Sequence, residues 1–319
     1  MSALSFSTRA GCITCGCGRS SAVWEGTYAD PDVERFMNRY GYAVDWSSEL
    51  DGRPISLVSC SDCNTLYHQH ILDSASLERL YSDWIDEAQI DTLTDNLESG
   101  SGPDAQFEAG VRNVRHLLRL NRLLRSDVRE DTPPWRILDF GCGAAEFLKQ
   151  ASLFGFETWG VDFSTTRASQ ALSQQISIIS SLNEYRERAN DQLHAITMFQ
   201  VLEHLDDPRS TLLELAELLM DGGLLIIEVP DCTTVSEEGV SAPRSFEEFR
   251  SVHPLEHINA FTPESLTRLV ESAGFNKINP GPAHVTDRPE AIVKSELTRF
   301  YEPKRTNQYF RKGSAGSVS

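Results

Sequence analysis

Buried strands and amphipathic helices alternate along residues 106–312. Short apolar runs predict strands at 136–140, 156–163, 176–179, 194–199 and 224–229. Apolar positions that recur every three or four residues predict helices at 145–154, 165–175 and 208–220. Strands that alternate with helices favour a doubly wound α/β fold, in which helices cover both faces of a mostly parallel sheet.

The flanks of this region extend the pattern. Apolar positions with helical spacing predict a helix over 106–126, ahead of the first strand. Asp207-Pro208 and Thr262-Pro263 each combine a capping residue with a proline and predict helix starts, the second helix running to Ser272. Further elements are predicted at 275–279 (strand), 288–300 (helix) and 307–311 (strand), and the Gly- and Ser-rich residues 313–319 are expected to be disordered.

A glycine turn connects the first strand to its helix. Gly141 and Gly143 follow the acidic residue Asp139, and glycine allows backbone conformations and close approaches that other residues do not. A nucleotide-like ligand can lie over such a turn, at the carboxyl end of a parallel strand. The next strand ends in Asp162, 23 residues after Asp139, where a strand–helix–strand unit places a carboxylate for two ribose hydroxyls.

The turn alone leaves two other interpretations open. It is compatible with a tight turn that has no ligand, and with a nicotinamide-binding fold. The nicotinamide fingerprint prefers G-x-G-x-x-G, whereas the third glycine position here is Glu146. This departure argues against a nicotinamide-dependent oxidoreductase.

Four segments in order, ILDFGCGAAEFL, GVDFS, AITMFQVLEHLDDP and GGLLIIEVPD, resemble class I S-adenosylmethionine-dependent methyltransferases. The resemblance covers residues 105–312 and implies a seven-stranded Rossmann-like sheet that binds S-adenosylmethionine. Ala145 stands where the family usually has a third glycine, and the acid expected after the third strand is not evident. The cofactor-binding residues that the resemblance implies are Asp139, Gly141, Cys142, Gly143, Asp162, Phe163, Leu182 and Gln200.

Two C-x-x-C pairs lie near the N-terminus. Cys12 and Cys15 form one pair and Cys60 and Cys63 the other, which is the ligand arrangement of a four-cysteine structural zinc site. Reduced cysteines without metal and a redox pair remain alternatives, and Cys17 is close enough to compete as a ligand. We therefore predict a zinc-ribbon-like domain over 1–84, a linker or lid over 85–105, and the methyltransferase domain over 106–312.

The stretch after the second cysteine pair adds to the resemblance. Many bacterial methyltransferases of surface-sugar and secondary-metabolite pathways begin with a zinc ribbon followed by a helix ending in Leu-Tyr, and Leu80-Tyr81 is similar to that ending. Ser76 is the expected cap of this helix. His68 and His70 alternate along a strand-like run and are expected to be exposed.

Histidines after the fourth and fifth strands are the candidates for acid–base chemistry. Glu203 and His204 are expected to order a loop, with a part in ligand positioning as the alternative. His257, with Glu256 beside it, resembles the Glu-His pair of sugar carbon-methyltransferases that also begin with a zinc ribbon, and this implies a base. Pro254 replaces a tyrosine of those enzymes, whose long C-terminal half is absent here, and both departures argue against carbon methylation. The alternative is that His257 only hydrogen-bonds a loop.

Composition narrows the setting. The formal net charge of −18 argues against a nucleic-acid or anionic membrane partner, because both need a basic surface. No apolar run reaches the roughly 20 residues that span a bilayer, and Met1–Ala10 lack a signal-peptide pattern, so we expect a cytoplasmic protein without disulfides. The expected function is methyl transfer to a small-molecule acceptor, such as a sugar or hydroxylated metabolite. A non-catalytic module that binds an S-adenosyl ligand is the alternative, and the oligomeric state stays open.

Overall fold

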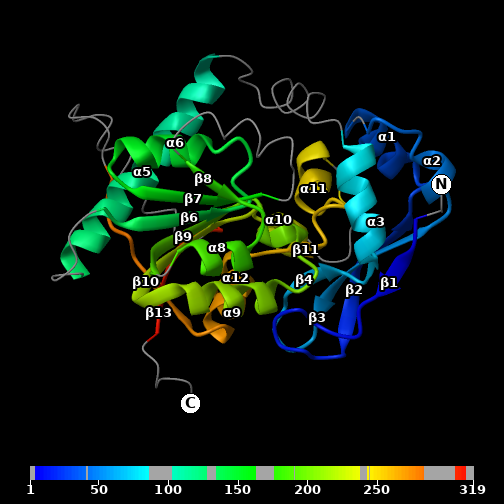
Figure 1. The fold of residues 1–319 in the computed structure, drawn as a ribbon. Helices are drawn as coiled ribbons and strands as arrows, with labels where there is room; N and C mark the ends of the chain where they lie inside the picture. The colour runs from blue at the N-terminus through cyan, green and yellow to red at the C-terminus, as the bar shows by residue number, and fades with distance from the viewer. Residues whose placement is uncertain are drawn as a thin grey trace. The chain divides into compact units, whose positions relative to one another are not determined.

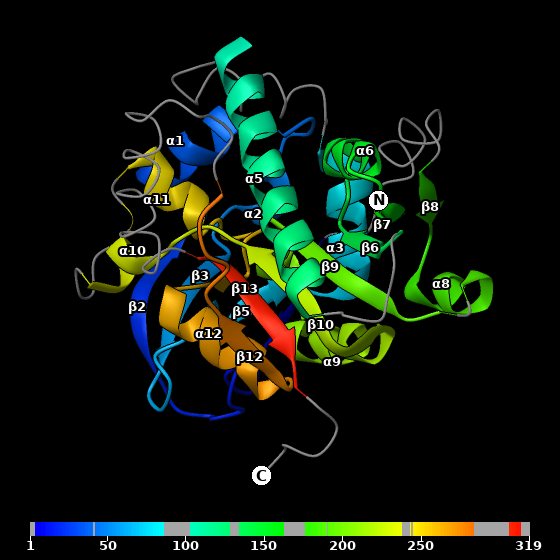
Figure 2. The ribbon, with the colours of Figure 1, turned by 90° about the vertical axis from the view of Figure 1, so that its left-hand side faces the viewer.

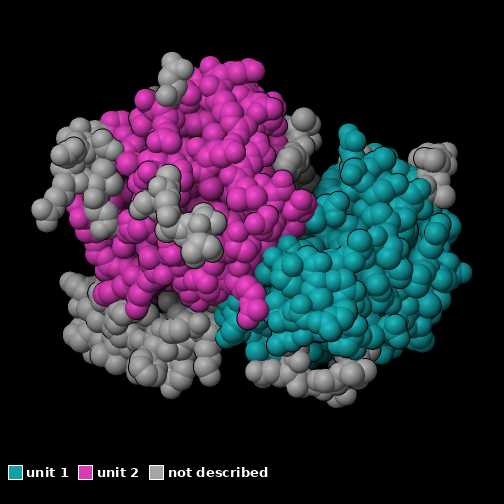
Figure 3. Space-filling model, turned by 90° about the horizontal axis from the view of Figure 1, so that it is seen from below, with its two compact units in different colours: residues 1–107, 203–206, 230–265 teal, residues 108–202, 207–229, 266–319 magenta. Residues whose placement is uncertain are grey.

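The computed structural model describes residues 4–40, 42–85, 103–127, 134–162, 176–189, 191–237, 243, 245–283 and 306–313. The chain divides into two compact units, coloured separately in Figure 3. Unit 1 comprises residues 1–107, 203–206 and 230–265, and unit 2 comprises residues 108–202, 207–229 and 266–319. The predicted helices at 165–175 and 288–300, most of the predicted linker, and nearly all of the predicted disordered tail lie outside the described residues.

Unit 2 is built on a seven-stranded sheet with the strand order β12-β13-β10-β9-β6-β7-β8. The strands are β6 (Arg136–Phe140), β7 (Glu157–Val161), β8 (Ser177–Ile179), β9 (Leu193–Phe199), β10 (Leu219–Glu228), β12 (Phe275–Ile278) and β13 (Asn307–Lys312). Strands β8, β7, β6, β9 and β10 are parallel, and β13 runs antiparallel to both β10 and β12. This arrangement confirms the predicted Rossmann-like fold class.

Helices cover both faces of this sheet (Figures 1 and 2). They are α5 (Pro103–Asp127), α6 (Glu146–Leu153), α8 (Leu182–Arg188), α9 (Pro208–Leu218) and α12 (Pro263–Ser272), the last of which begins in unit 1. Leu117 of α5 and Phe147 of α6 pack in one core with Ile137 and Ala195 of the strands, while α9 lies on the other side of the sheet. The strand residues are buried on both faces of the sheet, which explains why the strand sequences are continuous apolar runs.

The boundary between α9 and β10 differs from the prediction. The helix was expected to run to about Met220, but it ends at Leu218, and Leu219 already pairs with Leu193 of β9. The register shifts between Leu219 and Leu224, and Gly222 in this bulge has a φ of +76°. The two glycines therefore sit in an irregular part of the strand and do not end the helix.

Unit 1 contains a four-stranded antiparallel sheet with the order β11-β4-β3-β2 and a separate β1–β5 pair. The strands are β1 (Phe6–Thr8), β2 (Ser20–Thr27), β3 (Pro54–Cys60), β4 (Leu66–His68), β5 (His70–Leu72) and β11 (Asn259–Ala260). The helices are α1 (Pro31–Tyr40), α2 (Ser47–Leu50), α3 (Ser74–Arg79), the π-helix η1 (Leu80–Trp84), α10 (Thr233–Glu237) and α11 (Phe246–Ser251). The 3₁₀ turn η2 (Leu202–His204) brings Glu203 and His204 into this unit.

Residues 230–265 return to unit 1, although their position in the chain led the sequence analysis to include them in the methyltransferase domain. Strand β11 pairs with β4, and Phe249 of α11 stacks on Phe36 of α1 with 5.3 Å between ring centroids. Val252 and Leu255 are buried in the same core. Apolar side chains therefore hold this returning segment in unit 1.

Two local expectations in unit 1 are wrong. The cap of α3 is Asp73, which accepts a hydrogen bond from the Ser76 N–H at 2.8 Å, while the Ser76 hydroxyl accepts one from the Ser5 N–H at 2.9 Å. His68 is buried instead of exposed, and its Nε2 lies 2.9 Å from the carbonyl oxygen of Val252 in the returning segment.

Among the helices that the structure describes, none is long and apolar enough to cross a membrane.

Candidate active site and metal centre

The glycine turn after β6 is hydrogen-bonded to the end of β7. The N–H groups of Gly141 and Cys142 donate to the Val161 carbonyl at 2.7 and 3.0 Å. The Gly143 N–H donates to Oδ2 of Asp162 at 2.7 Å. The structure thus brings the predicted ribose-binding acid together with the predicted glycine turn, at the carboxyl ends of two adjacent parallel strands.

Two residues of this turn need glycine for different reasons. Gly141 has a φ of +80°, and a Cβ built on it would lie 2.3 Å from Cγ2 of Val201. Gly143 has a φ of +51°, and a Cβ built on it would meet no atom of the described residues within 4 Å. Ala145, which takes the place of the family's usual third glycine, also adopts a left-handed conformation with a φ of +60°. The open space beside Gly143 is where a ligand backbone or sugar can approach closely.

Asp139 and Cys142 point into the protein interior. The Asp139 side chain is buried and accepts a hydrogen bond from the Thr197 hydroxyl at 2.7 Å. Burial raises the pKa of Asp139 to about 7, against the opposing effect of the Thr197 hydrogen bond. Burial also raises the pKa of Cys142 to about 12, so its side chain is a packed thiol and not a nucleophile.

Leu182 and Gln200 lie after the neighbouring strands β8 and β9. Leu182 is a buried residue at the start of α8, behind the cap formed by Ser181. Gln200 has a φ of +57°, and its N–H donates to the Glu228 carbonyl at 2.8 Å. A non-glycine residue held in this conformation stores backbone strain, which is typical of ligand-binding turns. Phe163, the remaining predicted cofactor residue, lies outside the described residues.

An ionic network that the sequence analysis missed lies at the end of β10. Glu228 accepts hydrogen bonds from Arg112 of α5 at 2.8 Å and from the Asn307 amide at 2.9 Å. His116 lies 3.7 Å from the same carboxylate and hydrogen-bonds the Tyr309 hydroxyl. The partners come from α5, β10 and β13, so no local sequence pattern could have indicated them.

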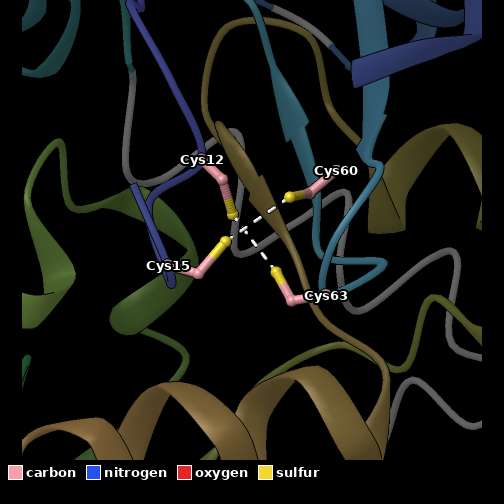
Figure 4. Close-up of side chains that lie close together, drawn as sticks. All are labelled: Cys12, Cys15, Cys60 and Cys63. Carbon is pink, nitrogen blue, oxygen red and sulfur yellow. Dashed lines mark hydrogen bonds between the residues drawn. The ribbon is translucent and has the colours of Figure 1, made fainter. Parts of the chain in front are cut away.

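The four predicted zinc ligands converge in unit 1 (Figure 4). Sγ of Cys12 lies 3.4 Å from Sγ of Cys63, Sγ of Cys15 lies 3.5 Å from Sγ of Cys60, and all four atoms lie within 4.8 Å of one another. In a tetrahedral four-sulfur zinc site with bonds of about 2.3 Å, the sulfur atoms lie about 3.8 Å apart. The cysteines are free thiols, and their arrangement fits a zinc ion.

The turns of the two cysteine pairs support the same geometry. Gly16, with a φ of +72°, donates its N–H to the Cys12 carbonyl, and Asn64, with a φ of +57°, donates to the Cys60 carbonyl. Cys17 lies outside the group of four, and its sulfur accepts a hydrogen bond from the Arg19 N–H at 3.4 Å. Burial raises the pKa of Cys15 to about 11, whereas for Cys60 the effect of burial is outweighed by hydrogen bonds, chiefly from the backbone of Asp62 and Cys63, which lower its pKa to about 7. A bound metal would favour the thiolate form of all four cysteines.

Glu256 belongs to a buried aromatic network in unit 1. Its carboxylate accepts hydrogen bonds from the hydroxyls of Tyr42 at 2.6 Å and Tyr40 at 3.1 Å. His253 contacts the same groups, with its Nε2 at 3.0 Å from the Tyr42 hydroxyl and at 3.7 Å from Oε1 of Glu256. Burial, and after it the charge of Glu256, raises the pKa of both tyrosines well above 10, so they remain donors. The sequence analysis included neither tyrosine.

His257 lies in a second group of polar residues. Its ring centroid is 4.8 Å from that of His204, and Nε2 of His204 is 3.9 Å from Oε1 of Glu203. Burial, followed by the charges of His204 and His253, lowers the pKa of His257 well below 6.5, so the imidazole is neutral near pH 7. Tyr81 of η1 completes the group through a 3.0 Å contact between its hydroxyl and Nδ1 of His204.

Comparison with known proteins identifies the class. The sequence profile of a family described as "Methyltransferase domain" matches residues 110–279, which is more than half of the chain. The chain is 28% identical over 174 residues to a ubiquinone biosynthesis O-methyltransferase of Ruegeria sp., matching 48% of this chain and 66% of that protein. It is 26% identical over 157 residues to the enzyme of that name from Aeromonas salmonicida, matching 44% and 62%. The matches thus span just under two thirds of these relatives.

Among solved structures, the plantazolicin methyltransferase BpumL in complex with SAH and a triazolic substrate analogue is similar in fold. It has a TM-score of 0.47 and 18% identity, covering 74% of this chain and 94% of that chain. The family match, together with the sheet order and the glycine turn, shows that the chain belongs to the class I S-adenosylmethionine-dependent methyltransferases. Membership of this class excludes the interpretation of the glycine turn as that of a nicotinamide-dependent oxidoreductase.

Proposed function

We propose that this protein transfers the methyl group of S-adenosylmethionine to an oxygen atom of a small-molecule acceptor, such as a sugar or another hydroxylated metabolite. The observation that carries the proposal is the hydrogen bond between the Gly143 N–H and Asp162, at 2.7 Å, in a chain of this family. Both curated relatives are named O-methyltransferases, which favours oxygen as the acceptor atom. The net charge of −18 argues against a nucleic-acid acceptor.

In this proposal the donor lies across the carboxyl ends of β6 and β7. Gly141, Gly143 and the backbone of Cys142 face its amino-acid part, and Asp162 accepts hydrogen bonds from the ribose. Asp139 precedes the turn and joins β6 to β9 through its hydrogen bond with Thr197, and Leu182 and Gln200 border the donor from the neighbouring strands. The sulfonium supplies the reactive methyl group, so the chain's own task is to orient the donor and the acceptor.

The donor site is tested by calorimetric titration of S-adenosylmethionine into Asp162→Asn. A hydrogen bond to a charged group contributes about 1.5–3 kcal/mol, so affinity should fall about 10- to 150-fold. Asp221→Asn is the matched control, because Asp221 is a surface acid of the same unit that pairs with Lys312. Equal affinity of wild type and Asp162→Asn would exclude Asp162 as the ribose ligand.

We propose His257 as the base for the acceptor. As the acceptor oxygen forms its bond to the methyl carbon, the carbon–sulfur bond breaks, S-adenosylhomocysteine leaves, and the hydroxyl proton passes to Nδ1 of His257. This nitrogen has no hydrogen-bond partner among the described residues, which supports a free lone pair. Glu256, held by Tyr40 and Tyr42, would position the backbone from which His257 projects.

The base is tested with His257→Ala and a panel of catechols, phenols and nucleotide sugars. Loss of a general base lowers the rate about 10²- to 10⁴-fold, while donor affinity should stay at the wild-type value. His70→Ala serves as the control, since His70 contacts Thr8 in β1 and is not part of the group around His257. A rate within a few-fold of wild type would leave His257 with a structural role. Donor binding without turnover on any acceptor would favour a non-catalytic binding module.

We further propose a structural zinc ion in unit 1, held by Cys12, Cys15, Cys60 and Cys63. The support is the four-sulfur geometry and the choice of thiolate ligands, which suits zinc. Four protein ligands leave no open position, so this ion would stabilise the fold of residues 1–84 and take no part in methyl transfer.

A further inference from the structure

We infer that Glu203, His204 and His257 form a second metal site, which binds a divalent transition-metal ion through one carboxylate and two imidazoles. The ligand atoms of the three side chains lie within 4.8 Å of one another. This inference rests on the proposed function, because the ion would hold the oxygen atom of the acceptor.

The orientation of His204 fits a metal ligand. Its Nδ1 lies 3.0 Å from the Tyr81 hydroxyl, while its Nε2 faces Glu203, 3.9 Å from Oε1. Metal-binding histidines usually engage the second ring nitrogen in a hydrogen bond, which fixes the tautomer and the ring orientation. Tyr81 does this for His204, whose Nε2 lies on the side of Glu203.

His257 is oriented in the same way. A hydrogen bond with the Ser251 backbone favours the charged imidazole and so opposes the effect of burial on the pKa of His257. Nδ1 has no hydrogen-bond partner among the described residues, so this bond belongs to Nε2 and the proton sits there. The lone pair is therefore on Nδ1. We assign Nε2 of His204 and Nδ1 of His257 as the nitrogen ligands of the ion.

Glu203 provides the charge that the site needs. Its side chain is only 1% exposed, so it is not a solvated surface acid that happens to lie near two histidines. One carboxylate and two neutral imidazoles form the ligand set of several catalytic metal sites, which keep positions open for substrate. Such a set binds both Zn²⁺ and Co²⁺, so a titration with Co²⁺ needs protein that carries only the one zinc ion of the four-cysteine site.

The chemistry follows from the open positions. A hydroxyl oxygen of the acceptor that binds the ion has a lower pKa, because the cation stabilises the oxyanion. With the ion held by Glu203, His204 and His257, the hydroxyl proton would pass to water, and the acceptor oxygen would form its bond to the methyl carbon as the carbon–sulfur bond breaks. With the ion bound, His257 is a ligand, whereas in the ion-free protein the same Nδ1 lone pair accepts the proton itself.

The test is calorimetric titration of CoCl₂ into protein whose four-cysteine site is already filled with zinc. Wild type should bind one Co²⁺ per chain in addition to that zinc. Glu203→Gln removes the charged ligand and should abolish measurable binding. Tyr81→Phe, at a residue that is 43% exposed, should weaken binding about 10- to 100-fold through loss of the hydrogen bond to His204. His70→Gln should bind as wild type does.

Two results would overturn the site. One is the absence of Co²⁺ uptake by the wild-type protein. The other is Co²⁺ uptake that is unchanged in both Glu203→Gln and Tyr81→Phe. The measurement needs no methyl transfer, so it is independent of the proposed function. Co²⁺ binding with the expected variant pattern in a protein without turnover supports the site and rejects the proposed function. Turnover without Co²⁺ binding rejects the site alone.

Discussion

Alanine substitutions at the two glycines of the turn should separate folding from donor binding. Gly141→Ala adds a methyl group that would lie 2.3 Å from Cγ2 of Val201, in a residue with a φ of +80°. Gly143→Ala adds the same group at a φ of +51°, where none of the residues described by the structure has an atom within 4 Å. The two variants thus share the conformational cost of the left-handed region and differ in what the new methyl group meets.

The expected losses of unfolding free energy follow from these contacts. An L-residue in the left-handed region costs about 1–2 kcal/mol, offset by about 0.4–1 kcal/mol because alanine restricts the unfolded chain. Gly143→Ala should therefore lose about 1 kcal/mol. Overpacking against Val201 adds about 1–3 kcal/mol, so Gly141→Ala should lose about 2–4 kcal/mol.

For donor affinity the order of the two variants should be reversed, with the larger loss in Gly143→Ala. In the proposed complex the space beside Gly143 is taken by the amino-acid part of S-adenosylmethionine, and a methyl group there would keep the donor from the backbone. Gly143→Ala should thus weaken binding about tenfold or more while the protein stays nearly as stable as wild type. Gly141→Ala should weaken donor binding less than Gly143→Ala does, at temperatures where it remains folded, because its added methyl group is directed at Val201.

The assays are urea unfolding followed by circular dichroism, and calorimetric titration of S-adenosylmethionine. Val201→Ala should relieve the clash, so the double variant should recover about 1–3 kcal/mol relative to the sum of the single variants. Wild-type donor affinity in Gly143→Ala would show that the donor does not lie over this turn. Additive losses in the double variant would show that the contact with Val201 is not the cause of the instability.

Three further outcomes are expected. Burial lowers the pKa of His68 to about 4, from about 6.5 in the unfolded chain. The free energy of unfolding should therefore fall by about 1.4 kcal/mol per pH unit as the pH drops from 6.5 toward 4. In urea titrations, His68→Gln should lack the part of this pH dependence that His68 contributes. Elemental analysis should find zinc in wild type and in Cys17→Ser but not in Cys60→Ser, and retention in Cys60→Ser would exclude the four-cysteine site. Tyr42→Phe should lower unfolding free energy by about 1.5–3 kcal/mol, since Glu256 loses its 2.6 Å hydrogen bond, and unchanged stability in urea would contradict this role.

Expectations that depended on neighbouring residues agree with the structure. The strand, glycine turn and helix after Arg136 form where the apolar run and Gly141 predict them, and Asp162 comes to the turn because only one helix separates the two strands. Asp207 caps α9 by accepting a hydrogen bond from the Ser210 N–H at 2.9 Å, as its position before a proline indicates. In each case the interacting groups lie within one strand–helix unit, so spacing along the chain limits where they can go.

The same locality explains the errors at the element ends. The two glycines in Leu219–Gly223 predict the end of a helix. Leu219 nevertheless pairs with Leu193 of β9 and therefore belongs to β10. His68 alternates along a strand as an exposed residue would, but the returning segment covers it with Val252. Pairing with a distant partner decided both positions, and the local pattern carries no information about that partner.

The class of the chain follows from the sequence: the doubly wound fold, the glycine turn with Asp162, and two cysteine pairs able to share an ion. Which distant side chains meet depends on the folded structure. Tyr40 and Tyr42 reach Glu256 across 216 and 214 residues, and Tyr81 reaches His204 across 123 residues. These contacts form because apolar residues of 230–265 are buried in the core of unit 1, and burial of apolar area is non-directional. Burial of apolar area therefore brings segments together although no sequence motif indicates which of their polar residues will meet.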